Sequence, residues 1–269
     1  MRTLIKKNMK VLFSLFILVL GIMTLASCNG DDATEKVGLD RIKEEGKLVL
    51  GFTEFPPFGY LEDNTYKGFD LELAKMVSDE LGVELVCKYI DWEAQVMEIQ
   101  ENVDCIWNAM TITEKRKENM IFTKPYWETN LVAVVLNDST LTKVDDLVGK
   151  TIAVEANGTA DINLSESKDY TVDKYTKVSD ALLAVKSNKA VALVADATYV
   201  TDVLSKYSGE YKVLDGTIGD IEEYGIAFRK EEADLRDEVD KIIDKLYSEG
   251  KIDALLAKYF GDANGFKRN

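Results

Sequence analysis

The stretch Asp104–Tyr126, DCIWNAMTITEKRKENMIFTKPY, holds the local signals around which the rest of the chain can be arranged. It begins with an apolar run typical of a buried strand, passes through a polar loop, and enters a short helix at Glu114. Thr113 precedes this helix and is a good N-cap, because its hydroxyl can accept a hydrogen bond from a free amide of the first turn. The stretch therefore predicts a strand, a loop and a helix start in close succession.

Arg116 lies in the first turn of this helix, at the end where the helix carries partial positive charge. Free amides, a hydroxyl and a guanidinium at one helix start would form an anion site, and the planar fork of Arg can bind both oxygens of a carboxylate. The alternative is a surface ion pair between Arg116 and a neighbouring Glu. The spacing by itself slightly favours the surface pair.

The residues before this stretch alternate between strand and helix patterns. Lys47–Phe52 and Val83–Ile90 are apolar runs of strand length. A helix opens near Asp70, which we expect to be its N-cap, and ends before Gly82. Trp92–Glu101 predicts a second, shorter helix. This βαβαβ order predicts a parallel sheet.

A second alternating series follows the stretch. The predicted strands are Leu131–Leu136, Thr151–Val154, Ala190–Ala195 and Tyr224–Phe228, and the predicted helices are Ser179–Lys186 with Ser179 as N-cap, a helix beginning at Asp196, Ala233–Ser248 and Ile252–Tyr259. The chain has 269 residues, enough for two domains or one large one. Both series are of the α/β class.

Composition excludes several function classes. The formal net charge is -15, which argues against nucleic acid and against anionic membrane surfaces as partners. The chain contains no His, which removes Ser-His and Cys-His catalysis and the usual zinc sites. We therefore predict no catalytic residues, no metal and no cofactor.

The N-terminus is typical of an exported protein. Residues 1–27 combine a basic head with an apolar run shorter than the roughly 20 residues of a spanning helix, which indicates a signal peptide. The run ends in Leu25-Ala26-Ser27-Cys28, which resembles a bacterial lipobox, where Cys becomes the lipidated first residue of the mature chain. An ordinary signal with an accidental Cys is disfavoured by the two small residues before Cys28. Residues 28–37 are mostly polar and predict a tether.

Two further cysteines, Cys87 and Cys105, lie in apolar strand-like runs. An even pair in an exported protein could form a disulfide. In a parallel sheet wound outward from its first strand, however, their strands would flank that strand and lie about two strand spacings apart, too far for a bridge. We expect two buried free thiols.

Several motifs together resemble one family. They are GFTEFPPFGY (51–60), YKGFDLELAKMVSDELGV (66–83), NAMTITEKRKENMIFTKPYW (108–127), NGTAD (157–161), VADA (194–197), YGIAFRK (224–230) and GKIDALLAKYFG (250–261). The chain resembles bacterial extracellular solute-binding proteins of the polar amino-acid class, the receptors of ABC importers, over nearly its whole mature length. The resemblance implies a two-lobed type II periplasmic-binding-protein fold that closes about a hinge. Lobe I would comprise 38–129 plus 223–269 and lobe II 130–222, each a parallel sheet flanked by helices.

The resemblance also implies a ligand site. Arg116 would hold the ligand carboxylate, with help from Thr111 and from Thr159 at a helix start. Asp196 would receive the ligand ammonium, although it could equally be a plain N-cap. The charges agree with a zwitterionic amino acid, which needs a cation, an anion and amide dipoles in a closed cleft.

The resemblance places other residues around the ligand side chain. Phe55 matches the position of an aromatic ring that covers the ligand, and Trp92 matches a pocket wall or serves equally as a core anchor. Ala109 lies where many relatives carry Ser or Gly, so one hydroxyl is missing and Asn108 is its candidate substitute. Glu54 faces either the cleft or solvent, and Asp70 could reach the ligand in addition to capping its helix. These two acids favour a polar ligand, with cationic amino acids among the options.

Three function classes remain open at this stage. The lipobox and the zwitterion site favour a monomeric, lipid-anchored extracytoplasmic receptor that delivers a free amino acid to an ABC importer permease, held at the cell membrane by an acyl chain (palmitate) on Cys28. An enzyme similar to cyclohexadienyl dehydratases would use the same fold but needs a proton-transfer group, and an amino-binding Asp196 argues against it. An amino-acid sensor that acts through a separate partner is the third.

Overall fold

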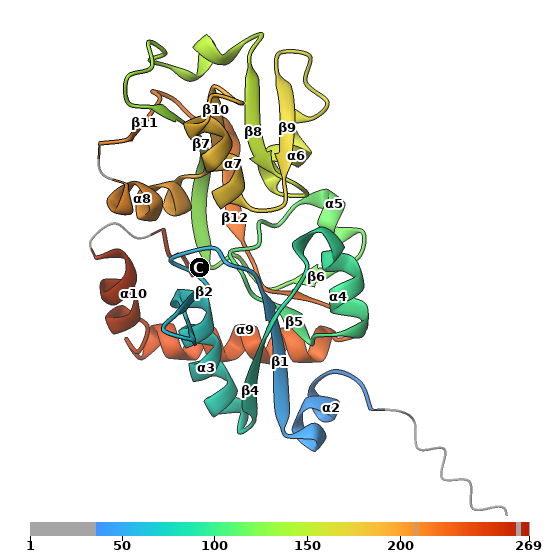
Figure 1. The fold of residues 1–269 in the computed structure, drawn as a ribbon. Coiled ribbons are helices and arrows are strands. Elements are labelled where there is room, and N and C mark those ends of the chain that lie inside the picture. Colours follow the sequence, from blue (N-terminus) through green and yellow to red (C-terminus); the bar gives the residue numbers. More distant parts are fainter. Residues whose placement is uncertain (1–35, 208, 262–264, 269) are drawn as a thin grey trace, which may run out of the picture. The chain divides into compact units, whose positions relative to one another are not determined.

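A computed structural model describes residues 36–207, 209–261 and 265–268 (Figure 1). The predicted signal peptide, Cys28 and nearly all of the tether lie outside the described residues.

Sheet I contains five strands in the order β4-β1-β5-β13-β6. These strands are β1 (Lys47–Phe52), β4 (Glu84–Tyr89), β5 (Cys105–Ile106), β6 (Ile121–Phe122) and β13 (Ala227–Phe228). β1 pairs in parallel with β4 and β5, as a nearly continuous apolar strand is expected to do. β13 runs antiparallel to β5 and β6, so the sheet is mixed where we predicted a parallel one.

The helices around sheet I divide between two hydrophobic cores. α2 (Gly38–Glu45), α3 (Phe69–Leu81), α9 (Ala233–Ser248) and α10 (Asp253–Phe260) contribute to the larger core. η1 (Trp92–Ala94) and α4 (Gln95–Glu101) contribute to the smaller one. A short hairpin of β2 (Tyr60–Glu62) and β3 (Thr65–Lys67) stands apart from both sheets.

Sheet II has the order β11-β7-β10-β8-β9, with β12 also paired to β7. Its strands are β7 (Trp127–Leu136), β8 (Thr151–Glu155), β9 (Thr171–Tyr175), β10 (Ala192–Asp196), β11 (Tyr211–Val213) and β12 (Ile218–Tyr224). β8, β9 and β10 are parallel, whereas β7 is antiparallel to its neighbours. The helices α7 (Val178–Lys186) and α8 (Ala197–Lys206) pack on one core, and η2 (Val144–Leu147) and α6 (Thr159–Leu164) pack on another.

β7 and β12 connect the two sheets (Figure 1). They pair in antiparallel register at Trp127 and Tyr224, and Tyr224 also bridges to Thr111 in the loop after β5. Gly225 donates its amide to the carbonyl of Met110 at 3.0 Å. The two expected crossings, near 128–130 and 222–224, fall on this strand pair, although the exact lobe boundaries remain a prediction.

Three local predictions are wrong. Asp70 does not cap α3: the N-cap is Gly68, and Asp70 is fully buried and bonded elsewhere. α7 starts one residue earlier than expected, so Lys177 rather than Ser179 is at the N-cap position. The single strand over 224–228 is two strands, because the chain leaves β12 at Tyr224 and pairs again only at β13.

The cysteines lie where the sheet argument places them. Cys87 and Cys105 are both free, and both are in register with Leu50 on opposite sides of β1. Two strand spacings separate them, about 10 Å, which exceeds the reach of a disulfide. Cys105 is buried as predicted, but the prediction of a buried thiol is wrong for Cys87, which is half-buried because β4 is an edge strand of sheet I. Burial raises the pKa of the Cys87 thiol to about 11 and that of the Cys105 thiol well above its usual value. Both are therefore poor nucleophiles.

Candidate functional site

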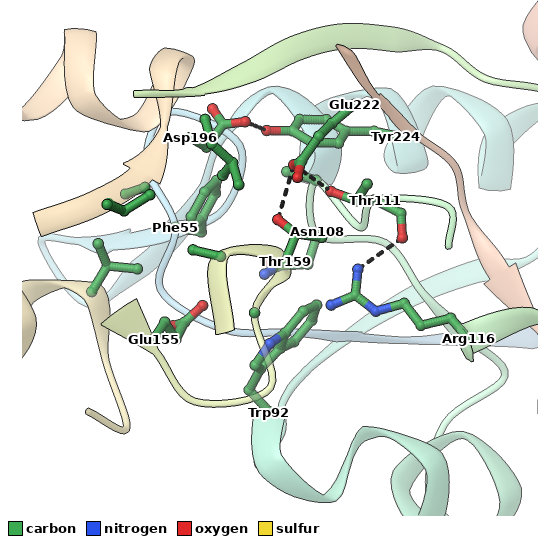
Figure 2. A pocket seen from close by; sticks show the side chains of 17 residues that line it. Phe55, Trp92, Asn108, Thr111, Arg116, Glu155, Thr159, Asp196, Glu222 and Tyr224 are labelled. Atoms are coloured by element: carbon green, nitrogen blue, oxygen red, sulfur yellow. Dashed lines mark hydrogen bonds between the residues drawn. The ribbon is translucent and has the colours of Figure 1, made fainter. Parts of the chain in front are cut away.

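A pocket is lined by residues from the loops and short helices beside sheet I, from strands and helices of sheet II, and from the connecting strand β12 (Figure 2). Seven predicted site residues line it: Phe55, Trp92, Ala109, Thr111, Arg116, Thr159 and Asp196. Sequence reasoning missed three polar residues that also line it, Glu155, Glu222 and Tyr224. The pocket therefore contains as many carboxyls as we expected, but two of the three are different residues.

Arg116 is buried, with 5% of its surface exposed. It belongs to α5 (Glu114–Lys117), and Thr113 caps that helix by accepting the amide of Arg116 at 3.2 Å, as predicted. The guanidinium donates to the carbonyls of Thr111 at 2.7 Å and Asn157 at 3.2 Å. The prediction of a surface ion pair between Arg116 and a neighbouring Glu, which the spacing slightly favoured, is therefore wrong.

The guanidinium of Arg116 retains capacity for an anion. Its Nε is buried and lacks a hydrogen-bond partner among the described residues. Its carbon lies 5.4 Å from the centre of the Trp92 ring, a cation–π contact. Burial lowers the pKa of Arg116 to about 10, against the opposing effect of Glu222 and Glu155, so the group remains a cation at neutral pH.

Asp196 has both of its predicted properties, since it caps a helix and lines the pocket. Its Oδ1 accepts the amides of Thr198 at 2.7 Å and Tyr199 at 3.1 Å at the start of α8. Its Oδ2 accepts the hydroxyl of Tyr224. Burial raises the pKa of Asp196, and the hydrogen bonds it accepts oppose that rise.

Glu222 occupies the centre of the polar contacts. The hydroxyl of Thr111 donates to its Oε2 at 3.1 Å and the hydroxyl of Thr159 to the same atom at 2.9 Å (Figure 2). Along β12, Glu222 is buried between two exposed neighbours, Ile221 and Glu223. No sequence pattern indicates this burial, because the apolar Ile221 faces outward and the acid faces inward, an orientation that is set by the pairing of β12 with β7.

Glu155 ends β8, directly after the buried residues 152–154. Burial raises the pKa of its carboxyl to about 7, and the charge of Arg116 opposes the rise. Ligands of open α/β sheets commonly bind beyond the carboxyl ends of parallel strands, so an acid at this place was a recognisable candidate.

The aromatic and small residues line the pocket as expected. Phe55 stacks on Tyr199 of α8 with ring centres 4.8 Å apart. Trp92 is both a pocket wall and a member of the smaller core of sheet I, so both of its expected roles hold. Asn108 also lines the pocket, but its side-chain amide bonds to Thr53 at both ends, so it does not replace the missing hydroxyl.

The two remaining predicted residues do not line the pocket. Glu54 is exposed and faces solvent. Asp70 accepts the amide of Ala109 at 2.7 Å and the hydroxyl of Tyr126 at 2.9 Å, and burial raises its pKa to about 7. Ala109 has a φ of +50°, and its bond to Asp70 holds this loop against the pocket. The predicted link between these two acids and the ligand side chain is therefore wrong.

Within residues 36–207, 209–261 and 265–268, no group of three or more His, Cys, Asp or Glu is arranged to hold a metal ion. Across the same ranges, no helix has the length and apolar character needed to cross a membrane. The site is therefore described by its organic groups: one guanidinium, three carboxyls, hydroxyls and aromatic rings.

Two mixed sheets with helices on both faces, connected by β7 and β12 and sharing a charged pocket, define a two-lobed solute-binding protein of the type II class. Residues 48–262 match the bacterial extracellular solute-binding proteins, family 3, and the chain belongs to this family. The predicted fold class and family are thereby confirmed.

Known relatives agree with this assignment. The chain is 27% identical to the arginine-binding extracellular protein ArtP of Bacillus subtilis, over 91% of this chain and 97% of the relative. It is also 27% identical to the L-cystine-binding protein TcyJ of Escherichia coli, over 90% and 94%. Crystal structures of ArgBP from T. maritima include one with a TM-score of 0.79 at 35% identity, covering 84% of this chain and 100% of that chain. These relatives are binding proteins, which confirms the prediction of a binding protein rather than an enzyme and indicates an extracytoplasmic location.

Proposed function

We propose that the protein is a monomeric receptor that binds a free cationic amino acid by hinge closure and delivers it to an ABC importer permease. Lobe I would comprise 38–129 plus 223–269 and lobe II 130–222. The observation that carries the proposal is one pocket with Arg116 from the sheet I loops and Asp196 from the end of a sheet II strand. These two groups match the two ends of an α-amino acid.

The charge balance of the pocket favours a cationic side chain. Its lining contains three carboxyls, on Glu155, Asp196 and Glu222, and only one cation among the described residues, Arg116. With a neutral amino acid these carboxyls would lack a further cationic partner, and burial raises the pKa of all three, which favours their protonated forms. A cationic ligand adds one positive charge to the pocket. Glu155 lies apart from the polar groups around Glu222, so a ligand held there by its backbone can extend its side chain toward Glu155 (Figure 2). ArtP and ArgBP are both named for arginine, so L-arginine is our first candidate.

A thermal-shift screen of the purified mature chain against the twenty amino acids and cystine tests this proposal. A ligand that binds only the folded state raises the melting temperature by mass action. We expect the largest rise with L-arginine and smaller rises with other cationic amino acids. Shifts confined to Leu, Ile and Val would contradict the cationic assignment, and the absence of any shift would contradict amino-acid binding.

We also propose that a lipid on Cys28 anchors the mature chain at the membrane and that residues 28–37 tether it. The lipobox-like sequence 25–28 supports this assignment. Replacing Cys28 with Ala should move the protein from the membrane fraction to the soluble fraction, because one acyl-bearing residue is the expected anchor. A Cys28→Ala chain that stays in the membrane fraction would show another anchor.

A further inference from the structure

The side chain of Glu222 accepts hydrogen bonds from two other residues that line the pocket. It is 7% exposed and lies on β12, two residues before Tyr224. Its Oε2 accepts a hydrogen bond from the hydroxyl of Thr111, in the loop after β5, and another from the hydroxyl of Thr159, at the start of α6, which packs on sheet II. Two donors from separate parts of the fold therefore fix the orientation of one carboxylate.

The second oxygen of this carboxylate has no such partner. Oε1 of Glu222 is buried and accepts no hydrogen bond from the described residues. A buried carboxylate oxygen without a donor is costly, because it has lost water and gained nothing in return. The oxygen is therefore poised for a donor that the protein itself does not supply.

The neighbouring carboxylate of Asp196 indicates what kind of donor would bind this oxygen. Tyr224 donates its hydroxyl to Asp196, and the charge of Asp196 raises the pKa of Glu222 together with burial, the larger effect. Figure 2 shows both carboxylates at the same part of the pocket, away from Glu155. The charge of Arg116 lowers the pKa of Glu222, but its guanidinium donates to two main-chain carbonyls rather than to this carboxylate. Two neighbouring acids repel each other unless a cation lies between them, and an ammonium has three N–H groups to share.

We propose that Glu222 is a second receptor for the α-ammonium of the ligand, and that the hydroxyls of Thr111 and Thr159 orient it for this role. The proposal rests on the proposed amino-acid binding and adds a specificity-determining residue to it. It also changes the role predicted for the two threonine hydroxyls, which hold Glu222 rather than the ligand carboxylate. The ligand carboxylate is then left to Arg116, whose Nε is free of protein partners in the described parts of the chain.

The test compares Glu222→Gln with Glu223→Gln. The first variant removes the charge but keeps an oxygen that the two hydroxyls can bond. The second makes the same charge change one residue away, on an exposed side chain of the same strand. Thermal unfolding without ligand checks that both variants fold like the wild type.

The probes are L-arginine and 5-guanidinopentanoic acid, which lacks only the α-ammonium, with L-glutamine and glutaramic acid as a second matched pair. Calorimetry should show that Glu222→Gln weakens binding of the amino acid by about tenfold to 150-fold, the range for a hydrogen bond to a charged group. The deaminated partner should change by less than about threefold, and Glu223→Gln should change neither probe. Only an ammonium contact produces this difference within a pair.

Other outcomes overturn the proposal. Equal losses for both members of a pair would show that Glu222 acts on closure or folding rather than on the ammonium. Amino-acid affinity within about threefold of wild type, less than about 1 kcal/mol, would show no contact. Wild-type protein that binds no amino acid would remove the proposed function, and this inference with it, whereas wild-type binding with an unchanged variant removes the inference alone.

Discussion

The two sheets contribute opposite charges to the pocket, and they do so by different local structures. Sheet I supplies Arg116 from a four-residue helix in a loop, and the guanidinium is held by the carbonyls of Thr111 and Asn157. Sheet II supplies Glu155 and Asp196 directly from the ends of two parallel strands. A cation on a long side chain can reach a site from a loop, whereas short acids must lie where the backbone places them.

This difference predicts which substitution costs most. Arg116 is the only cation that lines the pocket among the described residues, so nothing else can replace it. Replacing it with Ala should weaken the binding of L-arginine by about 30- to 4000-fold, since truncating one member of a buried charge pair costs roughly 2–5 kcal/mol. Isothermal titration calorimetry measures the loss.

The ligand series and a neighbouring residue provide controls. Agmatine lacks the carboxylate, so its affinity should be nearly the same for Arg116→Ala as for the wild type. Lys115→Ala removes an exposed cation one residue away and should leave L-arginine binding unchanged. Binding of L-arginine to Arg116→Ala within about threefold of wild type would place the carboxylate site elsewhere.

Asp196 should give a smaller loss, because Glu222 remains to hold the ammonium. We expect Asp196→Asn to weaken L-arginine by about tenfold to 150-fold, the range for hydrogen bonds to a charged group. Asn is as good an N-cap as Asp, so this variant keeps the start of α8. Asp196→Ala removes the cap as well and should lower the free energy of unfolding by about 1 kcal/mol more, measured by urea denaturation. Equal stability of the two variants would contradict the capping role.

The sequence predicted the regular elements well where the patterns are long. β1 and α9 have the predicted bounds, since a continuous apolar strand and a long amphipathic helix each specify their own structure. The two-residue β6 and the three-residue β11 were not predicted, because they are too short for a period to show and are recognised only by their pairing with neighbouring strands. The β2–β3 hairpin depends on a turn in which Asp63 and Asn64 both have positive φ.

Site residues that belong to a local sequence motif were predicted correctly. The prediction failed for residues whose partners are set by tertiary packing. Arg116 and Asp196 sit in recognisable local patterns and line the pocket. The sequence equally allowed Asp70 a capping role, and only the fold shows that it bonds Ala109 and Tyr126 instead. Glu222 depends on which face of β12 points inward, which is set by pairing with β7.

Glu155 should give the smallest effect on binding and the most informative one for the ligand side chain. Burial raises its pKa to about 7, so the group is about half ionised at neutral pH. Replacing Glu155 with Gln should weaken L-arginine by about fivefold at pH 7, roughly 1 kcal/mol, and leave L-glutamine nearly unchanged. An equal loss for both amino acids would show that Glu155 does not face the ligand side chain.

The pH dependence separates this charge effect from a change of shape. A cationic side chain binds the ionised carboxylate better, so wild-type affinity for L-arginine should rise between pH 6 and pH 8, and the rise should be smaller in Glu155→Gln.

The stability of the unliganded protein should change with pH in the opposite direction from the affinity. The pKa of Glu155 is raised on folding from 4.5 to about 7, so the folded protein loses stability as the pH rises from about 4.5 to about 7, and this contribution is constant above that range. Asp70, whose pKa is also about 7, contributes in the same direction and remains in the variant. Unliganded Glu155→Gln should therefore match the wild type at pH 4, below the unfolded pKa, and exceed its free energy of unfolding by about 1–3 kcal/mol at pH 8. Denaturant titrations at the two pH values measure this difference, and a variant less stable than wild type at pH 8 would show that the ionised carboxylate is stabilised by a protein partner rather than held ready for a cation.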